Sequence, residues 1–483
     1  MRQNRKIILY NTLSGEKEEF VPLSIDNITM YVCGPTVYSR AHLGNARSVV
    51  TFDVLYRLLN LVYGKRNVIY VRNITDIDDK INDCATQNKV TIQEITTRTT
   101  RWFHEDMLAL GNLPPNIEPR ATEYVHKMIE CIASLIAKGH AYEAMQHVLF
   151  DVSSFDKYGS LSGRNIEHMI AGARVEVAPY KKDPMDFVLW KPSNTEDTPG
   201  WDSPWGYGRP GWHIECSAMC HTLIGEQPDI HGGGVDLKFP HHENEIAQSC
   251  CMNESGKYAR YWIHNGHLSV NNEKMSKSLG NILTLHDLRQ KIPPVVIRMA
   301  LLATHYRQPL DWQDSSVEQA LAICTNWYNL LYNSDSQTEY ENASFSQETS
   351  ISDLIPEVIS AICDDLNTPA AITAIHNYAK TKNLKALYYA TKFLGLNLGD
   401  VLNTEGEIAK NHALIEKVLE ARKNARKNKK YAIADYLRDK LAEYGIKVYD
   451  NPESTSWDSS RSTDWETVHN FFYNWLSNND IHI

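Results

Sequence analysis

A strand–helix–strand pattern near the start of the 483-residue chain constrains the fold more than any other feature. Residues 28–33 are a β-branched and aromatic run that ends at a Gly-Pro turn, and residues 68–71 are a second such run. Between them, apolar residues recur at helical spacing over residues 46–63, and Gly64 ends that pattern. The three segments predict a βαβ unit, and therefore an α/β protein with a parallel sheet.

Parallel sheets of this kind bind ligands beyond the carboxyl ends of their strands. Cys33 and the loop after it follow the first predicted strand, and residues 73–76 follow the second. We therefore expect a ligand site where these two segments meet.

The composition narrows the class of protein. Hydrophobic residues make up 42% and charged residues 22%, which is ordinary for a globular chain. No apolar run reaches the roughly 18 residues of a membrane span, and no signal-peptide core follows the start, so we expect a cytoplasmic protein without a membrane partner. The net charge of −10, from 49 basic and 59 acidic residues, argues against indiscriminate coating of nucleic acid but not against one local basic surface.

Nine cysteines are scattered along the chain without a CxxC pair. An odd count without a secretion signal indicates reduced thiols, each of which is by default a small buried hydrophobic residue. Any metal site must therefore combine distant parts of the chain.

The rest of the chain shows further segments. Residues 121–138 are predicted to be helical, and residues 146–210, rich in Gly, Pro and Trp, are predicted to be an inserted, partly β module. Helical spacing recurs over 295–303, 317–331, 354–395 and 407–444, while the polar, acidic stretch 332–353 indicates a linker. The last helical region carries a run of basic residues: Arg422, Lys423, Arg426, Lys427, Lys429 and Lys430.

Two short motifs indicate phosphate chemistry. His42-Leu43-Gly44-Asn45 lies where the first strand's loop meets a helix N-terminus, which attracts anions, although a plain helix cap would look the same. Lys274-Met275-Ser276-Lys277-Ser278 is a polar loop with two lysines three residues apart, suited to a phosphate whose charge moves but also compatible with a solvated basic loop.

Together, the HLGN and KMSKS strings resemble those of class I aminoacyl-tRNA synthetases. Five further strings resemble the cysteinyl-tRNA synthetase family within that class: residues 31–38, 73–80, 211–219, 231–237 and 239–245. The resemblance is dense over residues 5–315 and continues more thinly to about residue 457, through 364–369 and 450–452.

The resemblance implies a two-step ligase reaction on L-cysteine, ATP and tRNA(Cys). The cysteine carboxylate attacks the ATP α-phosphorus, and a terminal ribose hydroxyl of the tRNA then takes the cysteinyl group without a covalent enzyme intermediate. His42 is implied to act on the α-phosphate, Lys274 and Lys277 on the pyrophosphate, and Mg²⁺ accompanies ATP.

The family also implies one zinc ion, held here by Cys33, Cys216, His241 and Glu245. Thiolate, imidazole and carboxylate are all zinc ligands, and His241 and Glu245 are spaced i, i+4 on one helix face. A pocket that reads shape alone separates such close analogues by only about 10–200-fold, whereas zinc prefers a soft thiolate. Selection by metal removes the need for an editing domain, which is consistent with the short inserted module.

The remaining implied site residues fall into three groups. The cysteine pocket is implied to include Thr75, Trp212 and His231. The ATP site is implied to include Gly44, Asn45, Gly232, Gly233, Asp236 and Lys277, with residues 232–234 letting the backbone approach the nucleotide. Asn45 departs from the family's usual histidine, so we treat it as a tolerated variant. The six basic residues from Arg422 to Lys430 are the expected tRNA contacts.

The expected domain organisation follows from these segments. It is a Rossmann-type catalytic domain with an insertion, then an α-helical bundle and a small C-terminal anticodon-binding domain. The predicted ranges are 1–113 and 206–265 for the two catalytic halves, 114–205 for the inserted module, 266–315 for the KMSKS loop and stem-contact region, 316–400 for the bundle, and 401–483 for the anticodon-binding region. We expect a monomer.

Two other functions fit part of the sequence. A ligase on the same fold that joins cysteine to an amino sugar would share the zinc and nucleotide sites but lack the C-terminal region, of which this chain keeps about 170 residues beyond residue 310. A non-catalytic RNA-binding relative would not need intact HLGN, KMSKS and metal-ligand residues. Cysteine-dependent ATP–pyrophosphate exchange followed by tRNA charging separates the three.

Overall fold

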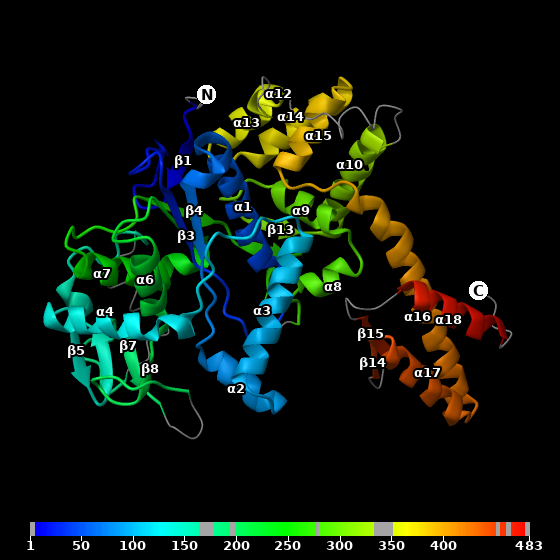
Figure 1. The fold of residues 1–483 in the computed structure, drawn as a ribbon, viewed down its shortest axis with the longest axis horizontal. Coiled ribbons are helices and arrows are strands. Elements are labelled where there is room, and N and C mark those ends of the chain that lie inside the picture. Colours follow the sequence, from blue (N-terminus) through cyan, green and yellow to red (C-terminus); the bar gives the residue numbers. More distant parts are fainter. Residues whose placement is uncertain are drawn as a thin grey trace. The chain divides into compact units, whose positions relative to one another are not determined.

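The computed structural model describes residues 5–163, 178–193, 199–275, 280–332, 351–450, 455–459 and 465–478. The described chain forms two compact units (Figure 1). Unit 1 comprises Met1–Arg289 and Pro294–Leu398, and unit 2 comprises Gln290–Pro293 and Gly399–Ile483. The predicted linker 332–353 lies, except at its ends, outside the described residues.

The centre of unit 1 is a four-stranded parallel sheet in the order β10-β9-β3-β4. Its strands are β3 (Ile28–Val32), β4 (Val68–Arg72), β9 (Ile230–Gly234) and β10 (Tyr261–Asn265). The predicted βαβ unit is therefore confirmed as β3, α1 (Leu43–Tyr63) and β4. An antiparallel hairpin, β1 (Ile8–Asn11) and β2 (Glu16–Glu19), precedes the sheet.

Helix α1 begins three residues earlier than its apolar pattern predicted, because His42 and Asn45 cap it reciprocally. Its end at Gly64, in a backbone conformation with φ of +90°, matches the prediction. The pleat of the sheet determines which residues of β3 and β9 face α1. Val32 pairs with Gly232, and a side chain at position 232 would run into Phe52 of α1, so these residues face α1.

The opposite face of the sheet carries Tyr31 and His231, whose rings stack at 5.2 Å. This face packs against α4 (Val125–Ala137), α6 (Trp212–Leu223) and α7 (Glu243–Met252) in one hydrophobic core that includes Val71, Met128 and Trp262. Helices therefore cover both faces, as in doubly wound α/β folds (Figure 1).

The long connection from β4 to β9 holds an antiparallel sheet in the order β5-β6-β7-β8, which corresponds to the predicted inserted module. Its strands are β5 (Ala141–Ala144), β6 (His147–Phe150), β7 (Phe187–Pro192) and β8 (Gly208–Pro210). The same connection holds α2 (Asp79–Asn88) and α3 (Ile92–Ala109). The short helical turns of this half are η1 (Lys65–Asn67), η2 (Ala121–Tyr124), η3 (Val152–Ser154), η4 (Val235–Leu237) and the π-turn η5 (Lys238–His242).

After β10 the chain forms a small sheet in the order β12-β11-β13. Its strands are β11 (Leu268–Val270), β12 (Glu273–Lys274) and β13 (Leu310–Trp312). The helices of this part of unit 1 are α8 (Leu285–Arg289), α9 (Pro294–Leu302), α10 (Asp314–Tyr332), α12 (Ile351–Leu354), α13 (Pro356–Cys363), α14 (Thr368–Lys380) and α15 (Leu384–Phe393). Between α9 and α10, the short strand β13 was not predicted.

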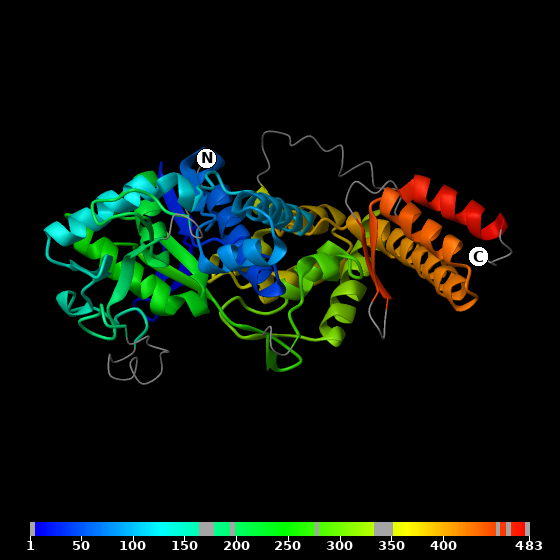
Figure 2. The ribbon, with the colours of Figure 1, turned by 90° about the horizontal axis from the view of Figure 1, so that it is seen from below.

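Unit 2 contains the helices α16 (Asp400–Lys427), α17 (Tyr431–Glu443) and α18 (Trp465–Asn478), with a hairpin of β14 (Ile446–Asp450) and β15 (Thr455–Ser459). The three helices lie side by side (Figures 1 and 2). Their core includes Ile415, Val418, Leu437 and Phe472, so part of the tail that the sequence pattern left unplaced belongs to this core. Among the described residues, no helix has the length and apolar character that a membrane crossing requires.

Candidate functional site

A cavity of about 460 Å³ opens beyond the carboxyl ends of β3 and β9, where the sequence predicted a ligand site. Its wall combines segments that are distant in sequence. The site residues that line it are Cys33, His42, Gly44, Asn45, Trp212, Gly234, Asp236 and Lys274.

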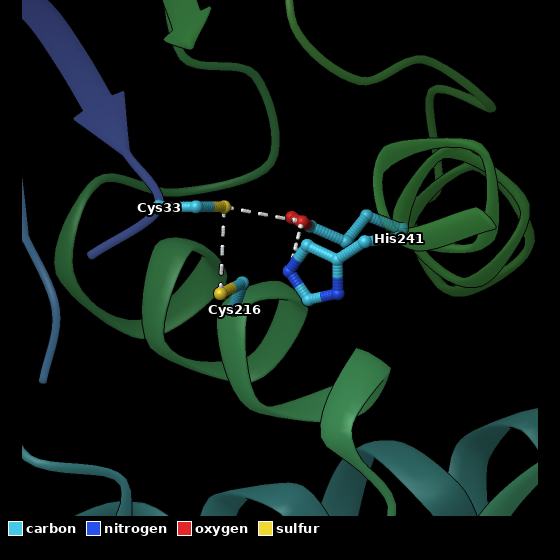
Figure 3. Close-up of side chains that lie close together, drawn as sticks. Cys33, Cys216 and His241 are labelled. Atoms are coloured by element: carbon cyan, nitrogen blue, oxygen red, sulfur yellow. Dashed lines mark hydrogen bonds and ion pairs between the residues drawn. The ribbon is translucent and has the colours of Figure 1, made fainter. Parts of the chain in front are cut away.

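The four predicted metal ligands lie together at this cavity. The Cys33 Sγ is 3.6 Å from the Cys216 Sγ and 3.3 Å from the Glu245 Oε1, and the His241 Nε2 is 3.0 Å from the same oxygen. Figure 3 shows the side chains of Cys33, Cys216 and His241 converging on one point. All four ligand atoms lie within 4.8 Å of one another.

Three chain segments bring these ligands together. Cys33 directly follows β3, and Cys216 lies in the first turns of α6, which packs on the same face of the sheet. His241 lies in the η5 turn and Glu245 in the first turn of α7, which continues it. The i, i+4 spacing therefore presents both side chains to the cluster, as predicted.

The charges within the cluster are strongly coupled. A hydrogen bond from Cys33 lowers the pKa of Cys216 to about 6 despite burial. Burial and the neighbouring Cys216 raise the pKa of Cys33 well above its usual range. Burial opposes the charged forms of both His241 and Glu245. Attraction to Glu245 and Cys216 nevertheless raises the pKa of His241 to about 10, and attraction to His231 and His241 holds the pKa of Glu245 well below its usual range.

This donor set fits a zinc ion. Two thiols, one imidazole and one carboxylate are ligand types that zinc binds in tetrahedral sites, and the spacing of their atoms leaves room for one ion. Of the four, Cys33 also lines the cavity, so an ion at this cluster would lie next to substrate space.

A second group of possible ligands overlaps the first. It shares Cys33 and Glu245 and adds His231 and His242. Regular helical geometry would place His242 about 100° around the helix from His241, yet its Nε2 lies 3.3 Å from the Cys33 Sγ. The π-helical turn that ends at His242 changes the angle between successive residues and brings this ring inward.

The neighbouring rings hold the cluster residues in place. The His241 Nδ1 lies 3.0 Å from the His213 Nδ1, and Trp212 stacks on the His241 ring at 4.2 Å. The His231 Nε2 lies 3.2 Å from the Glu245 Oε2, while its Nδ1 lies 3.3 Å from the Tyr258 hydroxyl. Such outer contacts fix which nitrogen faces a metal.

The HLGN segment is at once a helix cap and part of the cavity wall. The Asn45 N–H donates to the His42 Nδ1 at 3.3 Å, and the Asn45 Oδ1 accepts from the His42 N–H at 3.1 Å. With Nδ1 accepting, the ring proton is assigned to Nε2. A Cβ at Gly44 would lie 3.0 Å from the His42 ring, so a glycine leaves room for that ring.

Only some of the other residues predicted to bind the nucleotide line the cavity. Lys274 and Asp236 line the cavity, whereas Lys277 lies outside the described residues. A Cβ at Gly232 would meet Phe52 at 2.2 Å, and one at Gly233 would meet Leu237 at 2.9 Å. Packing therefore accounts for these two glycines, and of residues 232–234 it is Gly234 that lines the cavity.

The predicted cysteine-pocket residues also differ in exposure. Trp212 is 39% exposed and lines the cavity. Thr75 and His231 are buried, at 2% and 0%. The Thr75 hydroxyl donates to the Glu215 Oε2 at 3.1 Å and so supports the wall beneath the loop after β3.

The structure corrects the prediction for one of the six basic residues expected to contact tRNA. Lys423, Arg426, Lys427, Lys429 and Lys430 are exposed, but Arg422 is only 3% exposed. Residue 422 continues the buried stripe of Ile415, Val418 and Leu419 at helical spacing, so it faces the core of unit 2 and not a tRNA surface.

Several residues of the site had no individual role predicted from the sequence. His213, His242, Tyr258 and Asn73 surround the predicted ligands; the Asn73 Oδ1 accepts the Gly34 N–H at 2.8 Å and fixes the loop that carries Cys33. Three of them, His213, His242 and Asn73, lie within strings that the resemblance covers. Their contacts depend on tertiary packing, which spacing does not reveal.

Two family models match the chain. One, described as the tRNA synthetases class I (C) catalytic domain, matches residues 19–322. The other, described as the cysteinyl-tRNA ligase anticodon binding domain, matches residues 412–457.

Relatives called cysteine–tRNA ligase match most of the chain. The Ruegeria pomeroyi protein is 57% identical over 392 residues, which cover 81% of each chain. The Rhodospirillum rubrum protein is 52% identical over 466 residues, 93% of this chain and 98% of that one. A Mycobacterium tuberculosis methionyl-tRNA synthetase in complex with methionyl-adenylate shares the fold with a TM-score of 0.52 at 14% identity, covering 79% of this chain and 93% of that one.

Proposed function

This chain belongs to the cysteinyl-tRNA synthetase family, and on that premise we propose that the cavity beyond β3 and β9 is its active site and that Cys33, Cys216, His241 and Glu245 hold zinc there. The chain is a cysteine–tRNA ligase, which joins L-cysteine to tRNA with ATP. The observation that carries the site assignment is the convergence of four ligand atoms at a cavity that the HLGN segment also lines.

In the first step, the substrate carboxylate attacks the ATP α-phosphorus and pyrophosphate leaves. The His42 Nε2–H and the N-terminus of α1 donate to the α-phosphate, where negative charge develops. Lys274 and Lys277 neutralise the departing pyrophosphate, and Mg²⁺ arrives with ATP as its counter-ion. Asp236 and Gly234 line the same cavity and are assigned to the nucleoside, together with Gly44 and Asn45 at the helix start.

The thiol of the substrate is assigned to the cluster end of the cavity. Zinc, when bound, supplies a soft Lewis acid that favours sulfur over the hydroxyl of serine. Cys33 and Trp212 face the substrate, while His231 holds Glu245 in place from behind. His241 is held by His213 and Trp212, so the ligand set is arranged before substrate arrives.

We choose the group with two cysteines over the group with His231 and His242. His242 already connects inward, since its Nδ1 lies 2.8 Å from the His264 Nε2 and the His264 Nδ1 lies 2.9 Å from the Thr12 hydroxyl. This chain of contacts suits a residue that supports Cys33. The first group also has a second thiolate, from Cys216, where the other group has a neutral ring, so it compensates the zinc charge better.

In the second step, the 3′-terminal ribose of tRNA(Cys) attacks the acyl carbon of the adenylate. The anticodon-domain match over residues 412–457 supports unit 2 as the part that reads the tRNA, with Lys423, Arg426, Lys427, Lys429 and Lys430 as exposed contacts. It also favours tRNA over an amino sugar as acceptor. We propose a cytoplasmic monomer with the domain ranges given above.

Two assays in sequence test the proposed function. We expect ATP–pyrophosphate exchange that requires cysteine and is not supported by serine, followed by charging of tRNA(Cys). Exchange without charging would favour the amino-sugar ligase, and absence of both would overturn the active-site assignment.

Metal analysis of variants tests the ligand set. Cys216→Ala and His241→Ala are expected to lose most bound zinc, while His242→Asn retains it. Cys324→Ala, which removes a thiol equally buried but in α10, is the matched control and should keep its zinc. Zinc lost from His242→Asn but kept in Cys216→Ala would assign the second group instead.

A further inference from the structure

Arg47 is a buried arginine that the motifs of the chain do not include. It lies in α1 two residues after Asn45, and its side chain is 2% exposed. Its Nη1 donates to the carbonyl oxygens of Gly266, at 3.0 Å, and His267. Its Nη2 donates to the carbonyl oxygens of Tyr306, at 3.2 Å, and Gln308, and lies 3.4 Å from that of His305. Both amino groups of the guanidinium are thus committed to backbone carbonyls.

The two segments that Arg47 holds lead into the same small sheet. Residues 266–267 directly precede β11, and residues 305–308 precede β13, with which β11 pairs in parallel from Leu268 and Leu310 onward. The strand β11 pairs on its other side with β12, where Ser269 lies opposite Lys274. Arg47 therefore holds together the segments that lead into β11 and β13. These two strands support β12, which carries Lys274.

The two segments also approach each other closely. The Gly266 N–H donates to the Tyr306 carbonyl at 2.7 Å, and a Cβ at position 266 would lie 2.6 Å from the Gln308 carbonyl oxygen. A larger residue would separate the two carbonyl groups that Arg47 bridges. The close approach is an independent sign that the relative position of these segments is tightly set.

The far end of the lysine-bearing loop returns to the same helix start. The Leu43 N–H donates to the Leu283 carbonyl, and the Leu285 N–H donates to the Ala41 carbonyl, both at 2.9 Å. The Asn281 side-chain amide donates to the Lys274 carbonyl at 3.3 Å, which closes the base of the loop. The Leu283 end is thereby fixed to the segment that carries His42, and the Lys274 end is held near it through Asn281.

The chemistry of this contact requires arginine. Burial lowers the pKa of Arg47 to about 10, so its side chain remains charged at neutral pH. A planar guanidinium can serve carbonyl groups on two segments at once, whereas a lysine ammonium is a point charge with three donors on one atom. Lysine would keep the charge and lose the bridge.

We propose that Arg47 is a positioning residue for adenylate formation, which sets Lys274 against His42 by bridging the segments that precede β11 and β13. This inference rests on the proposed function, because it assumes that His42 and Lys274 act on the phosphates of ATP. Arg47 also lines the cavity, but both amino groups of its guanidinium donate to backbone carbonyls, so we assign it to act through these residues.

The test compares Arg47→Lys with Arg298→Lys by pyrophosphate exchange, normalised to active sites that bind cysteinyl-adenylate analogue. Arg298 is an equally buried arginine of unit 1 that donates to the carbonyl oxygens of Leu394 and Leu110 and pairs with Asp53, and none of these partners belongs to the segments that Arg47 bridges. For Arg47→Lys we expect kcat to fall at least about tenfold, while the KM for cysteine and the zinc content stay unchanged. For Arg298→Lys we expect a lower melting temperature and an unchanged kcat per active site.

A second variant covers the case in which Arg47→Lys does not fold. Gly266→Ala leaves Arg47 in place but separates the two segments, and it should show the same fall in kcat with unchanged zinc. Normal kcat in the folded variants at both positions, or equal losses in Arg298→Lys, would overturn the inference. If His42→Ala and Lys274→Ala also leave exchange unchanged, the proposed function fails as well; if they lower it, only the role of Arg47 fails.

Discussion

His42 uses its two ring nitrogens for different tasks. Nδ1 accepts the Asn45 N–H and caps α1, so the ring proton is assigned to Nε2, and the residue also lines the cavity. The helix cap and the phosphate donor, which the sequence presented as alternatives, are therefore compatible in one residue. Asn45 takes part as the reciprocal cap, a task that does not need the charge of the family's usual histidine.

The burial of His42 predicts a dependence of stability on pH. Burial lowers its pKa from the ordinary value of 6.5, partly opposed by Asp236. As pH falls below 6.5, the unfolded chain takes up this proton before the folded chain does, so the free energy of unfolding decreases. We expect His42→Gln to lose less stability than the wild type between pH 7.5 and pH 5, measured by urea unfolding. Equal losses would contradict this prediction.

Gly232 provides a second prediction at the residue scale. Because a Cβ there meets the Phe52 ring at 2.2 Å, Gly232→Ala should lower the free energy of unfolding by about 1–3 kcal/mol and change the KM for ATP little. Phe52→Leu in the same chain should recover part of the loss, as a double-mutant cycle in urea would measure. A large rise in the KM for ATP without a loss of stability would instead support the nucleotide role predicted from sequence.

At the scale of elements, Asp365 joins the helical part of unit 1 to its first strand. Its carboxylate accepts from the Tyr10 N–H at 2.9 Å, the Tyr306 hydroxyl at 2.7 Å and the Arg307 Nε at 2.7 Å. It is fully buried and lies in the 364–369 string that the resemblance singled out without a role. Asp365 thus also holds the segment 305–308, to whose carbonyl groups Arg47 donates.

Removing this carboxylate should be costly. We expect Asp365→Ala to lower the free energy of unfolding by about 3 kcal/mol, because it breaks a buried ion pair and leaves several donors without an acceptor. Its neighbour Asp364 pairs with Lys17 at the surface, where both side chains are exposed, so Asp364→Ala should change stability by only about 0.5 kcal/mol. Similar losses in the two variants, measured by denaturant unfolding, would refute the assigned difference.

At the scale of the whole molecule, the charge of −10 conceals two different regions. Unit 2 carries a run of exposed basic residues on the end of α16 and the turn after it. The acidic stretch 332–353 lies within the sequence range of unit 1. An acidic protein with one local basic surface can bind a polyanion selectively and with strong salt dependence.

The basic run predicts how tRNA binding responds to salt. Replacing Lys423, Lys427 and Lys430 together by Gln should raise the KM for tRNA and reduce the slope of log KM against log[KCl] by up to about 2, from about 0.7 per lost contact. Pyrophosphate exchange should be unchanged, since it needs no tRNA. As a control, Gln at the exposed Lys380, Lys382 and Lys385 of unit 1 should leave the salt slope unaltered. An unchanged slope in the first variant would remove these lysines from the tRNA site.

The sequence by itself determined part of the elements and the residue types that carry the chemistry of this protein. Alternating β-branched runs and helical spacing record local backbone preference, so the βαβ unit, the inserted β module and the C-terminal helices were predictable. The HLGN and KMSKS strings and four dispersed ligands were predictable because the chemistry demands particular residue types and the family resemblance assigns them.

Only the tertiary structure decided which of those residues face the site and which serve packing. The pleat of β9 turns His231 toward the metal ligands and Gly232 toward Phe52, although the two are adjacent in sequence. The π-helical turn brings His242 to Cys33, and the packing of α16 turns Arg422 inward. Arg47 could not be recognised at all, because its acceptors are backbone carbonyls, which every residue type carries. Their position is set by how distant segments pack, which one-dimensional spacing does not contain.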